Sequence, residues 1–166
     1  MDDQQILSVI NANGGNFRAN EFLNGRENLT KKIIEQLTIF RNWHGYPTLI
    51  TSAYRLTGSH RLGTAIDQII WKKWRVNQPD PIELWNIATT FPWHGVGLYF
   101  DWHLGIGLHT DLVAYSQRER PLRWIRVNHQ YYYQRFDGYF YSKITGQRKS
   151  LDDEIARYKD KKRKTV

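Results

Sequence analysis

The chain of 166 residues is long enough to bury one substantial core and too short for two full-sized domains, so we treat it as one folding unit with appendages. Hydrophobic residues make up 40% and aromatic residues 14% of it, which excludes a largely disordered chain. Cysteine is absent, and its absence excludes disulfides, a thiolate metal site and a cysteine nucleophile. The formal charge of +8 favours anionic partners, which include nucleic acid, anionic lipid and the anionic polymers of bacterial walls.

The N-terminal sequence gives no sign of export. Residues 1–5 are polar and acidic, whereas a secretory signal is basic and then apolar. No apolar run approaches the roughly 18 residues that a membrane span needs. We therefore expect a protein without signal peptide or membrane span that is made in the cytoplasm. If its substrate lies outside the cytoplasm, another factor must carry the protein there.

The first periodic pattern along the chain is helical. Apolar residues recur at helical spacing over residues 28–43, and Gly45 with Pro47 supplies a stop. The stretch 48–53 is rich in β-branched residues and predicts a strand. After a short loop, the apolar stretch 65–70 predicts a second strand.

A second helix is predicted from the signals at its start. Asp80 is a capping acid, Pro81 occupies the first helical position, and Glu83 lies three residues after the cap. This helix should extend to about Phe91. From residue 95 the pattern changes.

Short apolar stretches separated by Gly and Asp follow. Residues 96–100, 106–112 and 123–127 each predict a strand, and hairpins are the natural connections between them. Together with the predicted helices, these strands indicate an α+β fold in which helices pack on a small antiparallel sheet.

The C-terminal region is predicted to be an aromatic hairpin followed by a basic helix. Tyrosines alternate with Arg, Asp and Gly over residues 129–144, with Asp137 and Gly138 at the tip. Ser150 can cap a helix that has acids in its first turn and basic residues at its end, an order that suits the helix dipole. We therefore divide the chain into a domain over residues 1–127 and an appended hairpin and helix over residues 128–166.

Asp67 is the first residue along the chain that indicates a functional site. It lies inside an otherwise apolar strand, where an unpaired carboxylate would cost about 2–7 kcal/mol or more, so it needs a partner. A zinc ion would meet that need. His60 precedes it by seven residues, with Gly63 between them to let the backbone turn, and could share the ion. The alternative partner of Asp67 is an arginine in a buried salt bridge.

A second histidine could complete the site. If residues 105–112 form a strand, its two-residue period places Gly107, His109 and Asp111 on one face. Gly107 adds no bulk to that face. His109 would then provide the third ligand, and catalytic zinc sites usually have three protein ligands and one open position. The alternative for each histidine is an ordinary hydrogen-bonded role.

These residues also match the motifs of a known family. The first group resembles the S-x-Y-R and S-x-H-x-x-G-x-A-x-D motifs of the zinc D-alanyl-D-alanine carboxypeptidase and murein endopeptidase superfamily, which shares the hedgehog fold: Ser52, Tyr54, Arg55, Ser59, His60, Gly63, Ala65 and Asp67. The second group resembles the closing H-x-D and R-W of its phage and bacterial members: His109, Asp111, Arg123 and Trp124. Residues 17–22 resemble the entry segment, so the likeness extends from about residue 17 to residue 124.

The resemblance implies a fold and a ligand set. The fold would be the α+β fold of the hedgehog and D-Ala-D-Ala peptidase type. His60, Asp67 and His109 fall on the positions that bind Zn²⁺. Arg55 falls on the arginine that contacts a substrate carboxylate, which its bidentate guanidinium suits, although a salt bridge to an acid of the site is the alternative. Ser59 falls beside the substrate, where it contacts substrate or supports the loop.

The reaction implied is zinc-assisted hydrolysis of peptide bonds in bacterial peptidoglycan, as in a phage endolysin or a bacterial murein peptidase. A general base must take a proton from water. Some relatives carry Glu three residues before the last histidine ligand, where this chain has Ile106. Asp111 is the first candidate for the base and His103 the second. Asp111 is alternatively a partner that orients a ligand.

The missing glutamate also favours a different function. The chain would then be a catalytically inactive peptidase-like protein that serves as a structural or wall-binding component of a virion, with other virion proteins bound through its basic C-terminal segment. Release as a lysin or assembly into a virion would each bring the protein to the wall. Nucleic-acid binding through the Arg and Tyr residues of 123–143 together with the basic C-terminal tail is a third hypothesis, which we do not expect as the main role.

Overall fold

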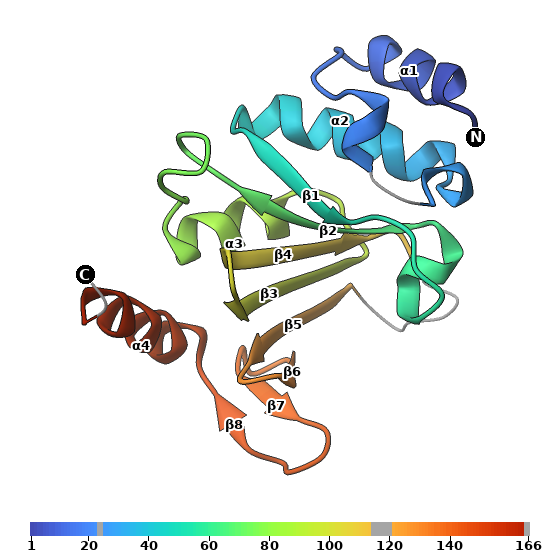
Figure 1. Ribbon diagram of the computed structural model, residues 1–166. Helices are drawn as coiled ribbons and strands as arrows, with labels where there is room; N and C mark the ends of the chain where they lie inside the picture. The colour runs from blue at the N-terminus through green and yellow to red at the C-terminus, as the bar shows by residue number, and fades with distance from the viewer. Residues whose placement is uncertain (23–24, 114–120, 165–166) are drawn as a thin grey trace.

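We describe the computed structural model of the chain over residues 1–22, 25–113 and 121–164 (Figure 1). These residues form a mixed α and β fold with four α-helices, three short 3₁₀ helices and one eight-stranded sheet. The α-helices are α1 (Asp3–Ala12), α2 (Lys31–His44), α3 (Pro81–Thr90) and α4 (Leu151–Arg163), and the 3₁₀ helices are η1 (Ala19–Phe22), η2 (Arg26–Asn28) and η3 (Gly58–Leu62). Among them is no helix that is long and apolar enough to cross a membrane.

Each of the four α-helices begins at a side-chain cap, of which two were predicted from the sequence. The Thr30 side chain accepts from the Ile33 N–H at the start of α2, and α2 ends at Gly45 in the left-handed conformation. The predicted caps Asp80 and Ser150 begin α3 and α4. Helix α1 was not predicted from the sequence, although Asp2 and Gln5 form a capping box at its start.

The sheet has the strand order β1-β2-β4-β3-β5-β6-β7-β8. Its strands are β1 (Thr48–Ser52), β2 (Ala65–Ile70), β3 (Gly95–Trp102), β4 (Gly105–Asp111), β5 (Leu122–Val127), β6 (Gln130–Gln134), β7 (Phe140–Ser142) and β8 (Arg148–Lys149). The sheet is larger than the small sheet that we predicted, and it is mostly rather than wholly antiparallel. Strand β5 pairs with β3 in parallel, because β4 lies between β2 and β3 and has no free edge for a hairpin with β5.

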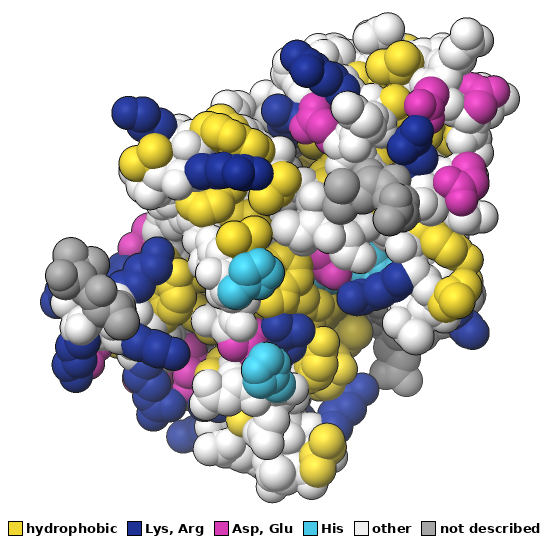
Figure 2. All heavy atoms as spheres, in the orientation of Figure 1, with side chains coloured by type: hydrophobic (Ala, Val, Ile, Leu, Met, Phe, Trp, Pro, Cys, Tyr) yellow, Lys and Arg dark blue, Asp and Glu magenta, His cyan; other side chains and the backbone are white. Residues whose placement is uncertain are grey.

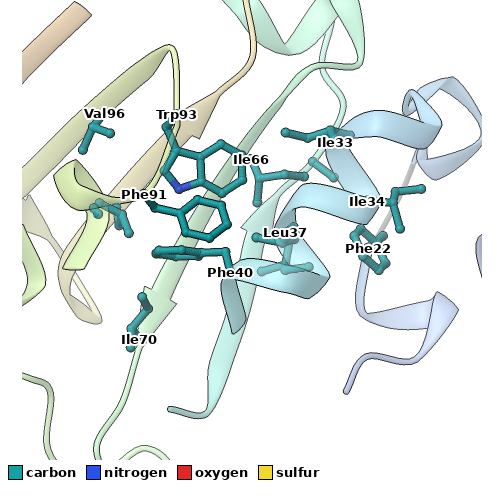
Figure 3. Close-up of a cluster of buried hydrophobic side chains, with 14 of the residues drawn as sticks. Phe22, Ile33, Ile34, Leu37, Phe40, Ile66, Ile70, Phe91, Trp93 and Val96 are labelled. Atoms are coloured by element: carbon teal, nitrogen blue, oxygen red, sulfur yellow. The ribbon is translucent and has the colours of Figure 1, made fainter. Parts of the chain in front are cut away.

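The apolar core lies between one face of the sheet and helices α1 to α3. Figure 3 shows Leu37 and Phe40 of α2 facing Ile66 and Ile70 of β2, with Trp93 beside them, and all five are buried. Phe40 makes an edge contact with the Trp93 indole, at 5.5 Å between ring centroids. Because strand side chains alternate between faces, these contacts turn the intervening residues of β2 and β4 to the opposite face.

The C-terminal region continues the same sheet. Strand β6 pairs with β5, and Phe140 of β7 belongs to the core and contacts the Trp85 ring of α3 at 5.6 Å. Helix α4 packs its Tyr158 ring against Phe100, at 5.9 Å, and Lys159 forms an ion pair with the α3 cap. The hairpin and the basic helix predicted over residues 128–166 are present, joined to the rest through strand pairing.

The position of Phe40 in the core can be tested against its neighbour on the same helix. Phe40→Ala should lower the free energy of unfolding by about 3–5 kcal/mol, because it leaves a cavity among buried rings. Ile39→Ala is the matched control. The Ile39 side chain is 40% exposed, so its loss should cost less than about 1 kcal/mol. Denaturant unfolding followed by tryptophan fluorescence measures both, and equal losses would contradict the packing described.

Candidate metal centre

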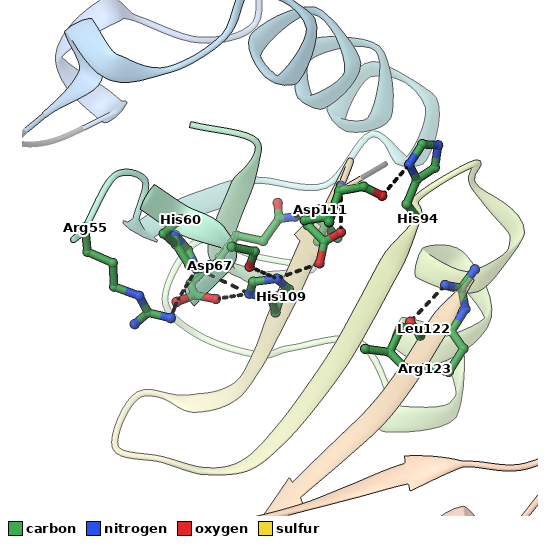
Figure 4. A network of polar contacts seen from close by, with 12 residues as sticks. Arg55, His60, Asp67, His94, His109, Asp111, Leu122 and Arg123 are labelled. Carbon is green, nitrogen blue, oxygen red and sulfur yellow. Dashed lines mark hydrogen bonds and ion pairs between the residues drawn. The ribbon is translucent and has the colours of Figure 1, made fainter. Parts of the chain in front are cut away.

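Three predicted ligands converge on the sheet face opposite the helices (Figure 4). Asp67 of β2 and His109 of β4 are directly paired across the antiparallel strands, and His60 comes from η3 in the loop before β2. The His109 Nδ1 atom is 2.7 Å from Asp67 Oδ1, and His60 Nε2 is 3.2 Å from Asp67 Oδ2. The two histidine nitrogens are 3.3 Å apart.

These separations fit a bound metal ion. Donor atoms that surround an ion tetrahedrally at about 2.0–2.1 Å lie about 3.3 Å from one another. Two of the three separations are within about 0.1 Å of that value, and the third is a hydrogen-bond distance that a shared ion would lengthen. Within the residues that the structure describes, this is the one group of three or more His, Cys, Asp or Glu side chains so arranged.

Each imidazole is held in the orientation that a metal ligand needs. The Nδ1–H of His60 donates to the Ala53 carbonyl at 2.6 Å, which leaves Nε2 to face Asp67. The Nε2 of His109 faces Asp111 Oδ2 at 3.2 Å and Ser59 Oγ at 3.4 Å, which leaves Nδ1 to face Asp67. Outer hydrogen bonds of this kind fix the tautomer and the ring plane of a metal-binding histidine.

The loop that carries His60 is fastened to the start of α2. Gly63 closes η3 with a φ of 63°, and its carbonyl accepts from both the N–H and the side-chain hydroxyl of Thr30, at 2.9 and 3.1 Å. A Cβ atom on Gly63 would lie 2.0 Å from the Asn28 carbonyl oxygen. The helix cap therefore fixes the loop, and only glycine fits where the loop turns toward β2.

Buried charges determine the protonation of the centre. Burial by itself would raise the pKa of Asp67, but hydrogen bonds from His109 and His60 outweigh it and hold that pKa well below its usual range. Burial would lower the pKa of His109, but Asp111 and Asp67 outweigh it and raise that pKa to about 8. Without a metal ion, the cluster at neutral pH is thus an ionised Asp67 beside a protonated His109.

Arg55 and His103 lie where the centre opens to solvent. A cleft of about 220 Å³ is lined by Arg55, Asp67 and His103 among others. The Arg55 guanidinium is 3.4 Å from Asp67 Oδ2, yet 47% of this side chain is exposed. Arg55 therefore makes the salt bridge considered as its alternative role, while its position still allows contact with a ligand in the cleft.

Asp111 lies on the other side of His109, away from the cleft. Its side chain is fully buried, and its Oδ1 accepts from the Val113 N–H at 3.0 Å while Oδ2 faces His109. This position is the one expected of a partner that orients a ligand. Ile106, at the position where some relatives carry a glutamate, points into the apolar core and leaves no acid there.

Two tryptophans lie beside the centre, of which the sequence indicated only Trp124, as a motif residue without a role. The Trp102 indole covers Gly107, and the Trp124 indole covers Gly97, so that a Cβ atom on either glycine would come within 2.3 Å of a ring. The ring centroids of Trp124 and His109 are also 5.0 Å apart. We expected Gly107 to leave its face open, whereas the structure uses both glycines to admit rings. A glycine inside a strand often signals such a close approach.

Comparisons of the chain with protein-family models, with curated proteins and with solved structures gave no significant match. The family resemblance therefore rests on the motif residues themselves. The structure brings three of these, His60, Asp67 and His109, together as a possible metal site.

The dependence of the centre on Gly63 can be tested with a matched pair of glycines. Gly63→Ala should destabilise the protein by more than about 1 kcal/mol and weaken metal binding, because the added Cβ meets the backbone of residue 28. Gly58→Ala, at the other end of η3, has a φ of 62° but nothing within 4 Å of its Cβ. Gly58→Ala should lower the free energy of unfolding only by the strain of the left-handed backbone conformation, and it should preserve metal binding. Thermal melts and metal titrations compare the two.

The metal-free protein should lose stability as the pH rises through about 8. Because the folded-state pKa of His109 is above its unfolded value of about 6.5, its contribution is fully present below pH 6.5 and is lost as the proton leaves. The loss should amount to about 2 kcal/mol between pH 6 and pH 9. Urea unfolding of chelator-treated protein measures it. His109→Gln should remove most of this dependence, and an unchanged pH profile would refute the assignment.

Proposed function

We propose that this chain is a zinc-dependent peptidase that hydrolyses peptide bonds in bacterial peptidoglycan. The observation that carries the proposal is the convergence of His60, Asp67 and His109 beside an open cleft that Arg55 also lines. The carboxylate and the two imidazoles form the ligand set of a catalytic metal centre rather than of a closed structural one.

The donor atoms favour zinc over other common ions. Two imidazole nitrogens and one carboxylate oxygen suit zinc, whereas calcium and magnesium prefer sites made of oxygen. The spacing of the donors is close to tetrahedral, which is the usual geometry of zinc. With three protein ligands, a bound zinc ion would keep a position for water or substrate, and Asp67 is the ligand that lines the cleft.

Each residue at the cleft then has a role in amide hydrolysis. When bound, zinc supplies Lewis acidity, which polarises the scissile carbonyl and makes a water molecule more acidic. Arg55 binds a substrate carboxylate through its exposed guanidinium. His103, which is exposed in the turn between β3 and β4 and lines the cleft, takes the proton as general base. Asp111 holds the His109 ring in place through its Nε2.

The substrate class is supported by the sequence. The order and spacing of the motifs, from Ser52 to Trp124, resemble murein peptidases, and the net charge of +8 favours an anionic polymer. Arg55 at the cleft is consistent with a substrate that carries a free carboxylate. We propose that the protein reaches the wall on release from the cell or as part of a virion.

The second candidate function is a peptidase-like virion component without turnover. The core position of Ile106 favours it, because the acid that some relatives use as the base has no counterpart at that position. Such a protein would keep the metal centre and bind the wall without cutting it. Activity of metal-loaded protein distinguishes the two candidates.

Purified protein should contain about one zinc per chain and release peptide fragments from purified murein in a chelator-sensitive reaction. His60→Ala should abolish both, because it removes a ligand. His103→Ala should retain zinc and lose about 10²-fold or more in rate, as expected for a general base. Metal analysis and mass spectrometry of the new peptide termini measure the outcomes. Zinc without hydrolysis would favour the inactive component, and failure to take up added zinc would end both proposals.

A further inference from the structure

A second hollow lies on the other side of the turn between β3 and β4. This hollow, which we call the basic groove, has a volume of about 530 Å³, and its lining includes Trp102, His103, His129, Tyr158, Lys161 and Lys162. Trp102 and His103 also line the cleft at the metal centre. The tip of the β3–β4 hairpin is therefore a shared wall of the two hollows.

The charge of the basic groove favours an anion. Two lysines of α4, Lys161 and Lys162, line it together with one acid, Asp101. The Asp101 carboxylate contacts Arg126 at 2.8 Å, the His129 backbone N–H, and the His129 Nδ1 at 3.6 Å. Figure 2 shows Lys and Arg side chains gathered over α4, with His side chains on the neighbouring surface. The balance of charge that a ligand meets is positive.

His129 occupies a backbone position that normally favours glycine. It is the second residue of the two-residue turn between β5 and β6, where Asn128 and His129 have φ values of 49° and 62°. Such turns prefer Asn followed by Gly, and histidine is one of the few other residues that occur at a positive φ. The His129 side chain is 84% exposed and lines the basic groove, with its Nδ1 3.6 Å from Asp101 Oδ2. The turn therefore presents this imidazole at the edge of the basic groove.

We propose that the basic groove is a second substrate subsite that binds an oxyanion of the wall polymer whose peptide bond lies in the cleft. The inference rests on the proposed function. The oxyanion is a phosphate of an attached polymer or a carboxylate of a neighbouring stem peptide, because ammonium and imidazole groups bind either. Nucleic acid is disfavoured, because the groove shares a wall with the cleft in which we propose that the murein peptide lies.

The lysines provide the first test, with a matched control on another helix. Lys161→Glu with Lys162→Glu should weaken sedimentation of the full-length, zinc-loaded protein with purified walls by about tenfold or more at low salt. Lys31→Glu with Lys32→Glu makes the same charge change on two exposed lysines of α2 and should have little effect. Equal binding by the Lys161 and Lys162 variant and the wild type, or equal weakening by both pairs, would overturn the proposal.

His129 provides a test that separates binding from folding. His129→Gly should leave the melting temperature unchanged or raise it, because glycine suits the turn, and should still weaken wall binding several-fold. Asn128→Gly places a glycine in the same turn without removing the imidazole and should bind as the wild type does. A His129→Gly variant that binds walls like the wild type would contradict a role for this imidazole and overturn the proposed subsite.

Three further outcomes identify the ligand. If walls stripped of phosphodiester-linked polymers bind the wild type as weakly as the lysine variant binds intact walls, the oxyanion is a phosphate. If stripping changes nothing, it is a carboxylate, and both results support the subsite. A lysine effect that is larger for duplex DNA than for walls would overturn it.

The subsite and the proposed function fail in different ways. Lysine-dependent wall binding by a protein that takes up no zinc and cuts nothing would refute the peptidase and leave the groove as a wall-binding surface. Zinc-dependent hydrolysis with wall binding that is indifferent to Lys161, Lys162 and His129 would refute the groove and leave the peptidase.

Discussion

The register between β2 and β4 is the constraint on which the rest of the structure depends. It places Asp67 opposite His109 on the sheet face that the helices leave uncovered, and it turns Ile66 and Leu108 into the core. A shift of one residue would bury the carboxylate among the helices, at a cost that the fold could not offset. The stability of the core and the geometry of the metal centre are therefore set by one pattern of hydrogen bonds.

Much of the fold could be predicted from local signals. Asp80 and Ser150 mark helix starts by one physical rule, the need of free N–H groups for an acceptor, and α3 and α4 were predicted for that reason. Helix α2 was predicted from its apolar periodicity and its glycine stop, and the structure adds Thr30 as its cap. The pairing of β5 with β3 could not be predicted in this way. It depends on which strand edge remains free once β2 has joined β4, and this is a property of the assembled sheet rather than of residues 122–127.

The candidate site was partly accessible to sequence reasoning. An acid in an apolar strand, such as Asp67, predicts a partner because burial is costly, and the motif resemblance identified His60 and His109 as that partner. Strand periodicity placed Asp111 and His109 on one face of the sheet. It could not predict that Asp111 contacts His109 Nε2 on the side away from the cleft, because that depends on side-chain rotamers. Trp102 was missed, and Trp124 was recognised only as part of a motif, because the contacts of both rings depend on Gly107 and Gly97 in neighbouring strands, which no local sequence pattern links to them.

Thr30 joins the start of α2 to the loop that carries His60. It caps α2 through its side chain and holds the carbonyl of Gly63, next to the loop that brings His60 to the centre. Opening of the first helical turn and release of that loop should thus be one cooperative event rather than two. By thermodynamic reciprocity, an ion held by His60 would slow hydrogen exchange of amides at the start of α2, and fraying of that helix end would in turn loosen the ion.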